Sequence, residues 1–358
     1  MIAGRVSSSV VQRQVRHVVP VPIASAAGLV AQVYAQVADE MRIVVPPALM
    51  HSPAPDVLAA YWALVREPMA ASGGVDRAAK EAVAAAVSVA NICPYCADMH
   101  TVGMYDLSGE QDAEAVAGDR VADIADPGLR AVTAWGRTAH LLDEAAPPPA
   151  GLGAADRADL IGVVVAFHYL TRMVNVFLAN FMLPPGMAPW SRRRLKRGIS
   201  RIMRPTLRTP REPGRAAALL PAAPLPGHAA WAAPRPAVAA AMAAADVTFG
   251  RAGERALSPE VRGLVTDHLA GWRGEETGIS TAWCEDLIAG LSPADRAAAR
   301  LALLTAVASY QAGDEVVAEF RRYHAGDAAL VGAAAWASWS AAALIGTRQA
   351  ATAGPVTN

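Results

Sequence analysis

Four residues in the first half of the sequence have the types and the spacing of a thiol redox site: Glu81, Cys93, Cys96 and His100. Two cysteines three residues apart can cycle between dithiol and disulfide with little movement of the backbone. On a helix, the two cysteines and the histidine fall within about 60° of one face. A helix that begins near Cys93 has a positive end there, which favours thiolate over thiol. The histidine can then carry protons, and the glutamate can orient it or a water molecule.

Other interpretations of the same residues remain open. A structural zinc site needs four ligands, and the third cysteine, Cys284, lies in the other half of the chain without a partner nearby. A catalytic zinc on Cys93, Cys96 and His100 is a further possibility, and so are two inert buried cysteines. We favour redox chemistry, and we expect neither a metal nor a cofactor.

The elements that must position these residues are predicted to be helices. Asp76 can cap a helix running through residues 80–90, which carries Glu81. A break at Asn91 leads into a second helix that starts near Pro94, because proline is well tolerated in a first turn. Further helices are expected at residues 25–45, 57–67 and 128–142, and from residue 156 onward.

The last of these helices, residues 160–184, is long and apolar enough to resemble a membrane span, and the basic run 192–197 follows it. Arg172 lies inside it, and a central arginine costs about 2.5–3.5 kcal/mol on insertion scales. We therefore predict a buried core helix and no membrane association. The N-terminus lacks the apolar stretch of a signal peptide, and three cysteines are too few for a disulfide scaffold, so we expect a cytoplasmic protein.

The composition fits helices throughout. The 358 residues are 53% hydrophobic, and 32 basic residues balance 32 acidic ones, which excludes a strongly charged or disordered chain. Alanine supplies much of the apolar fraction and is the best helix former. The 28 glycines and 26 prolines must interrupt the helices often. The length suits two small, mostly helical units.

The order of helices and breaks repeats at about half the chain length. Residues 155–165 are similar to residues 325–335, and residues 127–142 have a counterpart in residues 293–310, at offsets of 170 and 166. We therefore predict an all-α fold of two tandem copies. The expected divisions are an N-terminal helical extension (1–54), a first copy with the CxxC site (55–184), a Pro/Arg-rich linker (185–236), a second copy without it (237–347) and a tail (348–358).

The linker prediction rests on composition. Prolines recur between residues 184 and 236, and ten basic residues lie from Arg192 to Arg215, with Glu212 the only acid among them. Such a stretch is typical of an interdomain linker, here partly helical around residues 192–203. A patch for nucleic acid or anionic lipid is the alternative. Without interleaved aromatic residues or a known binding fold, we do not expect nucleic acid.

The spacing from Glu81 to His100 resembles the alkylhydroperoxidase D-like branch of the carboxymuconolactone decarboxylase superfamily. A second stretch, with Tyr169, Arg172 and Asn175 at three-residue intervals, is similar to the Tyr–x–x–Arg–x–x–Asn pattern of a later core helix in that family. The resemblance implies an all-α subunit that forms homo-oligomers, with a thiol peroxidase site near the subunit interface.

Roles for the four residues follow from the resemblance. It implies that Cys96 is the peroxidatic cysteine, which attacks a hydroperoxide to give a sulfenic acid. Cys93 would be the resolving cysteine that condenses with it to a disulfide, and a cellular thiol would regenerate the pair. Glu81 and His100 would form the proton relay. True carboxymuconolactone decarboxylases generally lack the cysteine pair.

The resemblance covers residues 55–184 well and reaches residues 237–347 only through the internal repeat. With the offsets above, the motif's counterpart falls at residues 259–268, where His268 has no cysteine before it. Cys284 sits too late to serve. The second copy is therefore expected to be degenerate, catalytically silent and structural, standing where a neighbouring subunit stands in single-domain relatives.

These observations favour a thiol-dependent peroxidase, that is, a peroxiredoxin-type oxidoreductase with a hydroperoxide substrate. Two other functions remain open. One is a carboxymuconolactone decarboxylase-like enzyme that uses His100 and Glu81 as acid and base. The other is a non-catalytic oligomeric scaffold that binds a charged partner through the basic stretch between Arg192 and Arg215.

Overall fold

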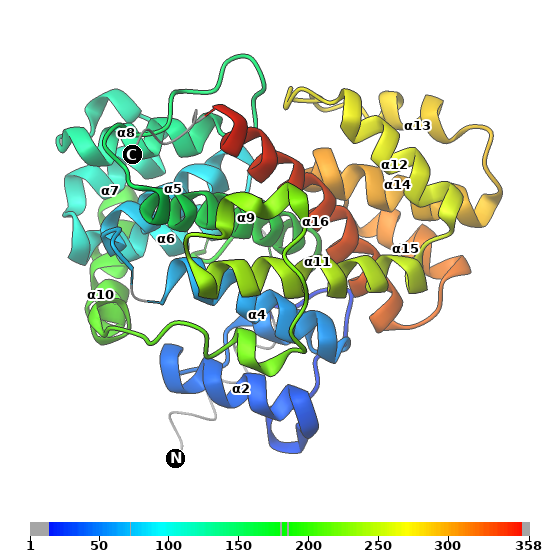
Figure 1. Cartoon of the computed structure of the whole chain (residues 1–358), viewed down its shortest axis with the longest axis horizontal. Coiled ribbons are helices and arrows are strands. Elements are labelled where there is room, and N and C mark those ends of the chain that lie inside the picture. Colours follow the sequence, from blue (N-terminus) through cyan, green and yellow to red (C-terminus); the bar gives the residue numbers. More distant parts are fainter. Residues whose placement is uncertain (1–13, 72, 180, 185, 353–358) are drawn as a thin grey trace.

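The fold is all helical throughout the part of the chain that the computed structural model describes, residues 14–71, 73–179, 181–184 and 186–352 (Figure 1). The only strand-like pairing there is an isolated bridge between Val15 and Leu178. The predicted all-α class is confirmed. The start of the expected extension (1–13) and the end of the expected tail (353–358) lie outside the described residues.

The helices fall into two groups on either side of a basic helix. The first group is α2 (Gly28–Met41), α3 (Pro46–His51), α4 (Pro55–Met69), α5 (Arg77–Ala90), α6 (Pro94–Leu107), α7 (Glu110–Ala117), α8 (Pro127–Thr138) and α9 (Ala154–Phe177). The basic helix is α10 (Pro189–Arg208). The second group is α11 (Pro236–Ala256), α12 (Pro259–Gly271), α13 (Ala282–Ile288), α14 (Pro293–Val307), α15 (Asp314–Tyr323) and α16 (Asp327–Thr352). Short 3₁₀ turns join them, among them η5 (Ser309–Gln311).

Local signals set several helix starts. Asp76 caps α5 by accepting from the Ala78 N–H, and Asp126 caps α8 by accepting from the Leu129 N–H, as the sequence predicts. Before α6 the capping position belongs to Cys93, followed by a proline at the first helical position. The first cysteine therefore stands at the helix start instead of within the helix.

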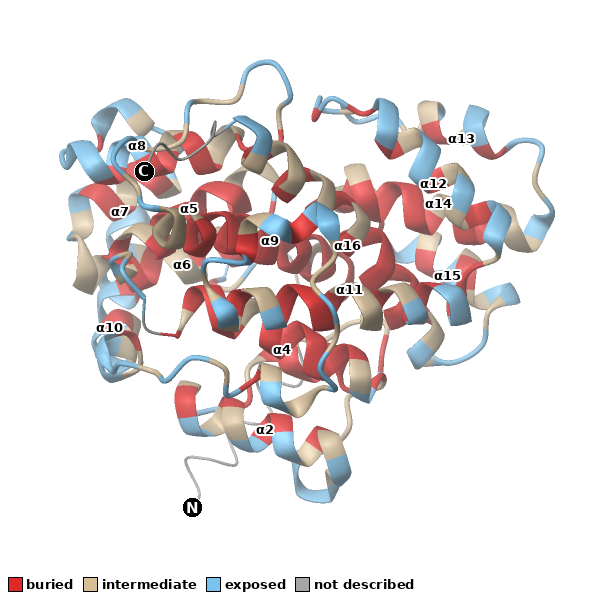
Figure 2. Cartoon of the chain, in the orientation of Figure 1, coloured by how far each residue is buried: buried red, intermediate tan, exposed pale blue. Residues whose placement is uncertain are grey.

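The centre of the molecule is α9, which is buried along nearly its whole length (Figure 2). Within the described residues, two helices are long and apolar enough to cross a membrane, α9 and α16, and 94% and 72% of their apolar windows are buried inside the protein. The two pack against each other, and a Cβ atom on Gly346 of α16 would lie 2.5 Å from Val165 of α9. Burial of the predicted core helix is confirmed, although the helix ends at Phe177.

The two helix groups repeat one arrangement. In the first, α5 packs against α6 and α9; in the second, α14 packs against α15 and α16. The groups meet where α4 packs against α11 and α9 against α16. Two halves that share a packing pattern are joined in this way around a common core.

The order of the helices differs between the halves, which corrects the predicted register. Helix α12 packs against α14, as α8 packs against α5. However, α12 precedes its partner α14 in the chain, whereas α8 follows its partner α5. Residues 259–268, the expected counterpart of the motif, lie inside the single helix α12. By packing, the counterpart of α5–α6 is α14–α15, whose helices start 216 and 220 residues later. Helix α16 also continues to Thr352, so the expected tail from residue 348 begins as helix.

The expected linker contains a long helix that docks on the motif-bearing hairpin, so residues 185–236 are more than a connection. Helix α10 lies along α6 (Figure 1) and turns Lys196 and Ser200 inward, while Arg194 and Arg201 face outward. The ion pairs that hold it are Arg192–Asp98, Lys196–Asp98, Lys196–Glu114, Arg197–Glu110, Arg204–Asp106 and Arg208–Asp106.

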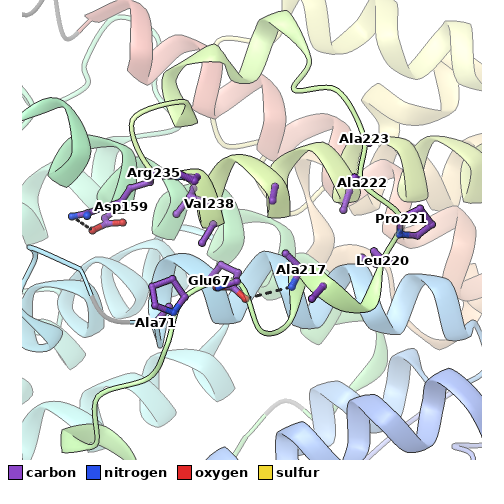
Figure 3. A pocket seen from close by; sticks show the side chains of 17 residues that line it. Glu67, Ala71, Asp159, Ala217, Leu220, Pro221, Ala222, Ala223, Arg235 and Val238 are labelled. Carbon is purple, nitrogen blue, oxygen red and sulfur yellow. Dashed lines mark hydrogen bonds and ion pairs between the residues drawn. The ribbon is translucent and has the colours of Figure 1, made fainter.

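After α10 the chain folds back over α4 and α11 (Figure 3). The buried carboxylate of Glu67 accepts from the N–H groups of Gly214 and Ala216, at 2.7 and 2.9 Å. Arg235 and Asp159 pair at 3.0 Å at the other end of the same groove, which has a volume of about 620 Å³ and is mainly apolar. One carboxylate on α4 therefore fixes the path of this segment.

Candidate active site

Helices α5 and α6 form a hairpin that brings the four motif residues together. The chain reverses direction after Asn91, where Ile92 adopts a left-handed conformation with φ of 51°. The N–H of Cys93 then donates to the Ser88 carbonyl at 2.9 Å. This turn places Cys93 at the start of α6 and Cys96 in its first turn.

Both thiols are buried, with exposed fractions of 1% for Cys93 and 3% for Cys96. Burial raises the pKa of Cys96 well above its ordinary value, and the hydrogen bond and charge of Cys93 raise it further. The sequence predicts the opposite, because a helix start favours thiolate. Here the cost of removing a thiolate from water outweighs the helix dipole, so Cys96 is a protonated thiol at neutral pH.

A second hydrogen-bonded group lies beside the thiols. Glu81 on α5 accepts from the Nδ1 of His100 at 2.7 Å and from the Nε of Arg77 at 2.8 Å. Burial by itself raises the pKa of Glu81, but Arg77 and His100 more than offset it and leave the pKa below its ordinary value. Glu81 is therefore a buried anion that holds the His100 ring by its Nδ1, leaving Nε2 free for a proton.

The His100 ring is held on two further sides. Phe167 of α9 meets it edge-on, with ring centroids 4.5 Å apart. Gly103, one turn along α6, lets the Glu81 carboxyl approach, since a Cβ atom there would lie 3.3 Å from its Cδ. Among the described residues no hydrogen bond joins His100 to either thiol. The motif thus forms two pairs, Glu81 with His100 and Cys96 with Cys93.

Three neighbours of the motif were not identified from the sequence. Arg77 stands four residues before Glu81 on the same helix, so its spacing was an available signal. Tyr61 on α4 is buried, and burial raises its pKa. The negative charge of a nearby Cys96 thiolate would raise that pKa further. Tyr95, between the cysteines, donates its hydroxyl to Gln14 at 2.8 Å. Nothing local in the sequence marks the last two contacts.

The Tyr–x–x–Arg–x–x–Asn stretch of α9 connects the two halves near this hairpin. Arg172 is buried, and its Nε donates to the Ala306 carbonyl at the end of α14, at 2.7 Å. Asn175 donates to the Asn91 carbonyl at 2.9 Å and to the Ser309 hydroxyl at 3.0 Å. The pattern therefore ties the turn before the cysteines to the equivalent turn of the second half.

The remaining sequence candidates lie elsewhere. The described residues contain no group of three or more His, Cys, Asp or Glu side chains that could hold a metal ion. Cys284 on α13 is fully buried. Burial raises its pKa to about 12, and the negative charge of Glu285 contributes to the increase. Like Cys96 it is therefore a protonated thiol at neutral pH, and it is remote from the hairpin in sequence.

Known proteins resemble this chain over both the hairpin and the full length. Residues 55–138, from the start of α4 to the end of α8, match the Carboxymuconolactone decarboxylase family. The alkyl hydroperoxide reductase Rv2159c of Mycobacterium tuberculosis (strain ATCC 25618 / H37Rv) is 37% identical over 334 residues, which make up 93% of this chain and 94% of that protein. A crystal structure of an alkylhydroperoxidase AhpD core, an uncharacterized peroxidase-related protein from Ralstonia eutropha JMP134, shares 25% identity with a TM-score of 0.40, over 46% of this chain and 90% of that one.

Proposed function

Because the chain belongs to the alkylhydroperoxidase D-like and carboxymuconolactone decarboxylase-like superfamily, we propose that it is a thiol-dependent peroxidase acting through Cys93 and Cys96. The observation that carries the proposal is the buried thiol pair on one helix start, beside the hydrogen-bonded Glu81 and His100. The relative's printed name, alkyl hydroperoxide reductase, points to the same reaction.

The proposed reaction has three steps. The Cys96 thiolate attacks a peroxide oxygen, so that an S–O bond forms, the O–O bond breaks and the leaving alkoxide takes up a proton. The Cys93 thiol then displaces water from the sulfenic sulfur and closes the disulfide. Two molecules of a cellular thiol reduce this disulfide and are themselves oxidised to a disulfide. His100, held by Glu81, is the proposed acceptor and donor of the protons.

Single-turnover kinetics test the proposal. The fully reduced protein and its Cys96→Ser, Cys93→Ser and Cys284→Ser variants are mixed with cumene hydroperoxide in a stopped-flow instrument. We expect Cys96→Ser to lose the first step, Cys93→Ser to form the sulfenic acid without the disulfide, and Cys284→Ser to behave as the unmodified chain. Equal peroxide consumption by all four proteins would rule out the mechanism. Loss of the first step in Cys93→Ser alone would reverse the two roles.

One observation favours a second candidate, a decarboxylase or isomerase that uses His100 and Glu81. The raised pKa of Cys96 leaves little thiolate at neutral pH, whereas the Glu81 anion is already hydrogen-bonded to His100 in an arrangement suited to acid–base chemistry. A Cys93→Ser, Cys96→Ser double variant separates the two. A decarboxylase would retain its turnover of a small lactone in that variant, and a peroxidase would retain nothing.

A further inference from the structure

The second half contains a cavity at the place where the first half carries its thiols. Helices α14 and α15 pack as α5 and α6 do, and a short stretch is alike in sequence: Asp295-Arg296-Ala-Ala, in the first turn of α14, matches Asp76-Arg77-Ala-Ala, which begins at the cap of α5. Counting 219 residues onward from the four motif residues therefore gives their counterparts, Arg300, Ala312, Glu315 and Glu319. All four line one cavity of about 630 Å³.

The pairing of the motif is retained with different residues. Arg300, in the place of Glu81, forms an ion pair with Glu319, in the place of His100. Arg300 also binds Glu285 through its Nε at 2.7 Å. A pair between the two helices therefore persists although its residue types differ, and it holds the hairpin together. The positions of Cys93 and Cys96 are taken by the small Ala312 and the exposed Glu315, which leave space between the helices.

Two acceptor groups of this cavity, on Glu315 and Gln311, lack partners within the described part of the chain. Arg300 is held by two carboxylates, and Arg16 at the rim is paired with Asp314. Glu315 is exposed and forms no ion pair within the described part of the chain. The buried Oε1 of Gln311, which also lines the cavity, has no hydrogen-bond partner there either. A ligand that satisfies these groups must bring N–H donors and positive charge.

We propose that this cavity binds a small organic molecule with a primary ammonium group. The volume is in the range of small-molecule sites, roughly 300–1,000 Å³. Four carboxylates against two arginines give the lining a net negative charge, which attracts a cation. The ammonium group would lie between Glu315 and Gln311, and the site requires neither cysteine.

Calorimetric titration of the full-length protein at low salt tests the site, with 1,4-diaminobutane as the probe and glutarate as an anion of similar size. We expect saturable binding of one diamine per chain, no binding of glutarate, and affinity about tenfold weaker in Glu315→Gln. Glu260→Gln is the matched control, because Glu260 is an exposed acid in the first turn of α12. Gln311→Leu should weaken binding as well.

The proposal is overturned if the diamine does not bind, if glutarate binds equally well, or if Glu315→Gln binds like the unmodified chain. The Cys93→Ser, Cys96→Ser double variant should bind the diamine with unchanged affinity. The site and the proposed peroxidase activity can therefore fail independently.

Discussion

At the scale of single residues, two opposing effects act on Cys96. Its place in the first turn of α6 favours a thiolate, and its burial favours a thiol. The helix end contributes about 0.3–1 kcal/mol in ordinary positions, whereas desolvation of a fully buried group shifts a pKa by up to about 3–5 units. Burial therefore decides the resting protonation state.

The reaction of Cys96 with iodoacetamide should accordingly rise about tenfold per pH unit from pH 7 to beyond pH 9, because only the thiolate reacts. Mass spectrometry of the modified peptide measures the rate for each cysteine separately. Cys284, whose pKa burial raises to about 12, serves as an internal reference for a buried thiol outside the motif. A plateau at or below pH 8 would show that Cys96 is already a thiolate at neutral pH.

Glu81→Gln should destabilise the protein by about 3 kcal/mol at pH 7, since removing one member of a buried ion pair leaves its partners uncompensated. The pKa of Glu81 lies below its ordinary value, so its contribution is present above about pH 4.3 and lost as pH falls through the folded-state pKa. The deficit in urea unfolding should therefore shrink at low pH. Glu110→Gln, which breaks the more exposed pair with Arg197, should cost at most about 1 kcal/mol.

At the scale of elements, α10 is notable because charges, rather than apolar side chains, dock it. Its inward face presents Lys196 and Ser200, and Leu207 is its one buried apolar residue. Lys196 lies 3.1 Å from Glu114 and 3.5 Å from Asp98. The helix that covers α6 is thus held by a buried cation between two carboxylates.

Lys196→Met should destabilise the protein by roughly 2–4 kcal/mol, because the methionine keeps the stem and leaves both carboxylates without their buried cation. Arg194→Met, on the outward face of the same helix, should change stability by no more than about 0.5 kcal/mol. Urea denaturation of the two variants provides the comparison. Equal effects would mean that α10 is not docked on α6 in solution.

At the scale of the whole molecule, the two halves share one core. Helix α9 contacts α16, and α4 contacts α11. Buried hydrogen bonds also join the first half to the second. Trp135 on α8 donates to the Oε1 of Gln349 on α16 at 2.6 Å, and the Nε2 of Gln349 donates to the Ala139 carbonyl at 2.8 Å. A shared core predicts a shared unfolding transition.

Calorimetry should therefore show one transition whose calorimetric and van't Hoff enthalpies agree. Gln349→Ala should lower the stability of the whole chain by about 1–3 kcal/mol, because it leaves two buried polar groups without partners. Thr352→Ala, at the exposed end of the same helix, should have almost no effect. Two separate transitions, only one of them shifted by Gln349→Ala, would contradict a common core.

The sequence by itself determined the helical class, several helix starts and the grouping of the motif residues. Asp76 and Asp126 cap helices through contacts two or three residues away. Glu81 and His100 meet because one short turn joins their two helices. Such features follow from short-range geometry, which residue spacing encodes.

The tertiary structure alone decided the rest, because it depends on contacts between distant segments. Burial within the folded molecule, rather than the local helix end, sets the pKa of Cys96. Charges more than 80 residues away dock the helix around Lys196. The order of α12 and α14 shifts the second motif to Arg300 and Glu319, which the offsets of 166 and 170 do not reveal. Desolvation, long-range ion pairs and helix order are properties of the packed molecule.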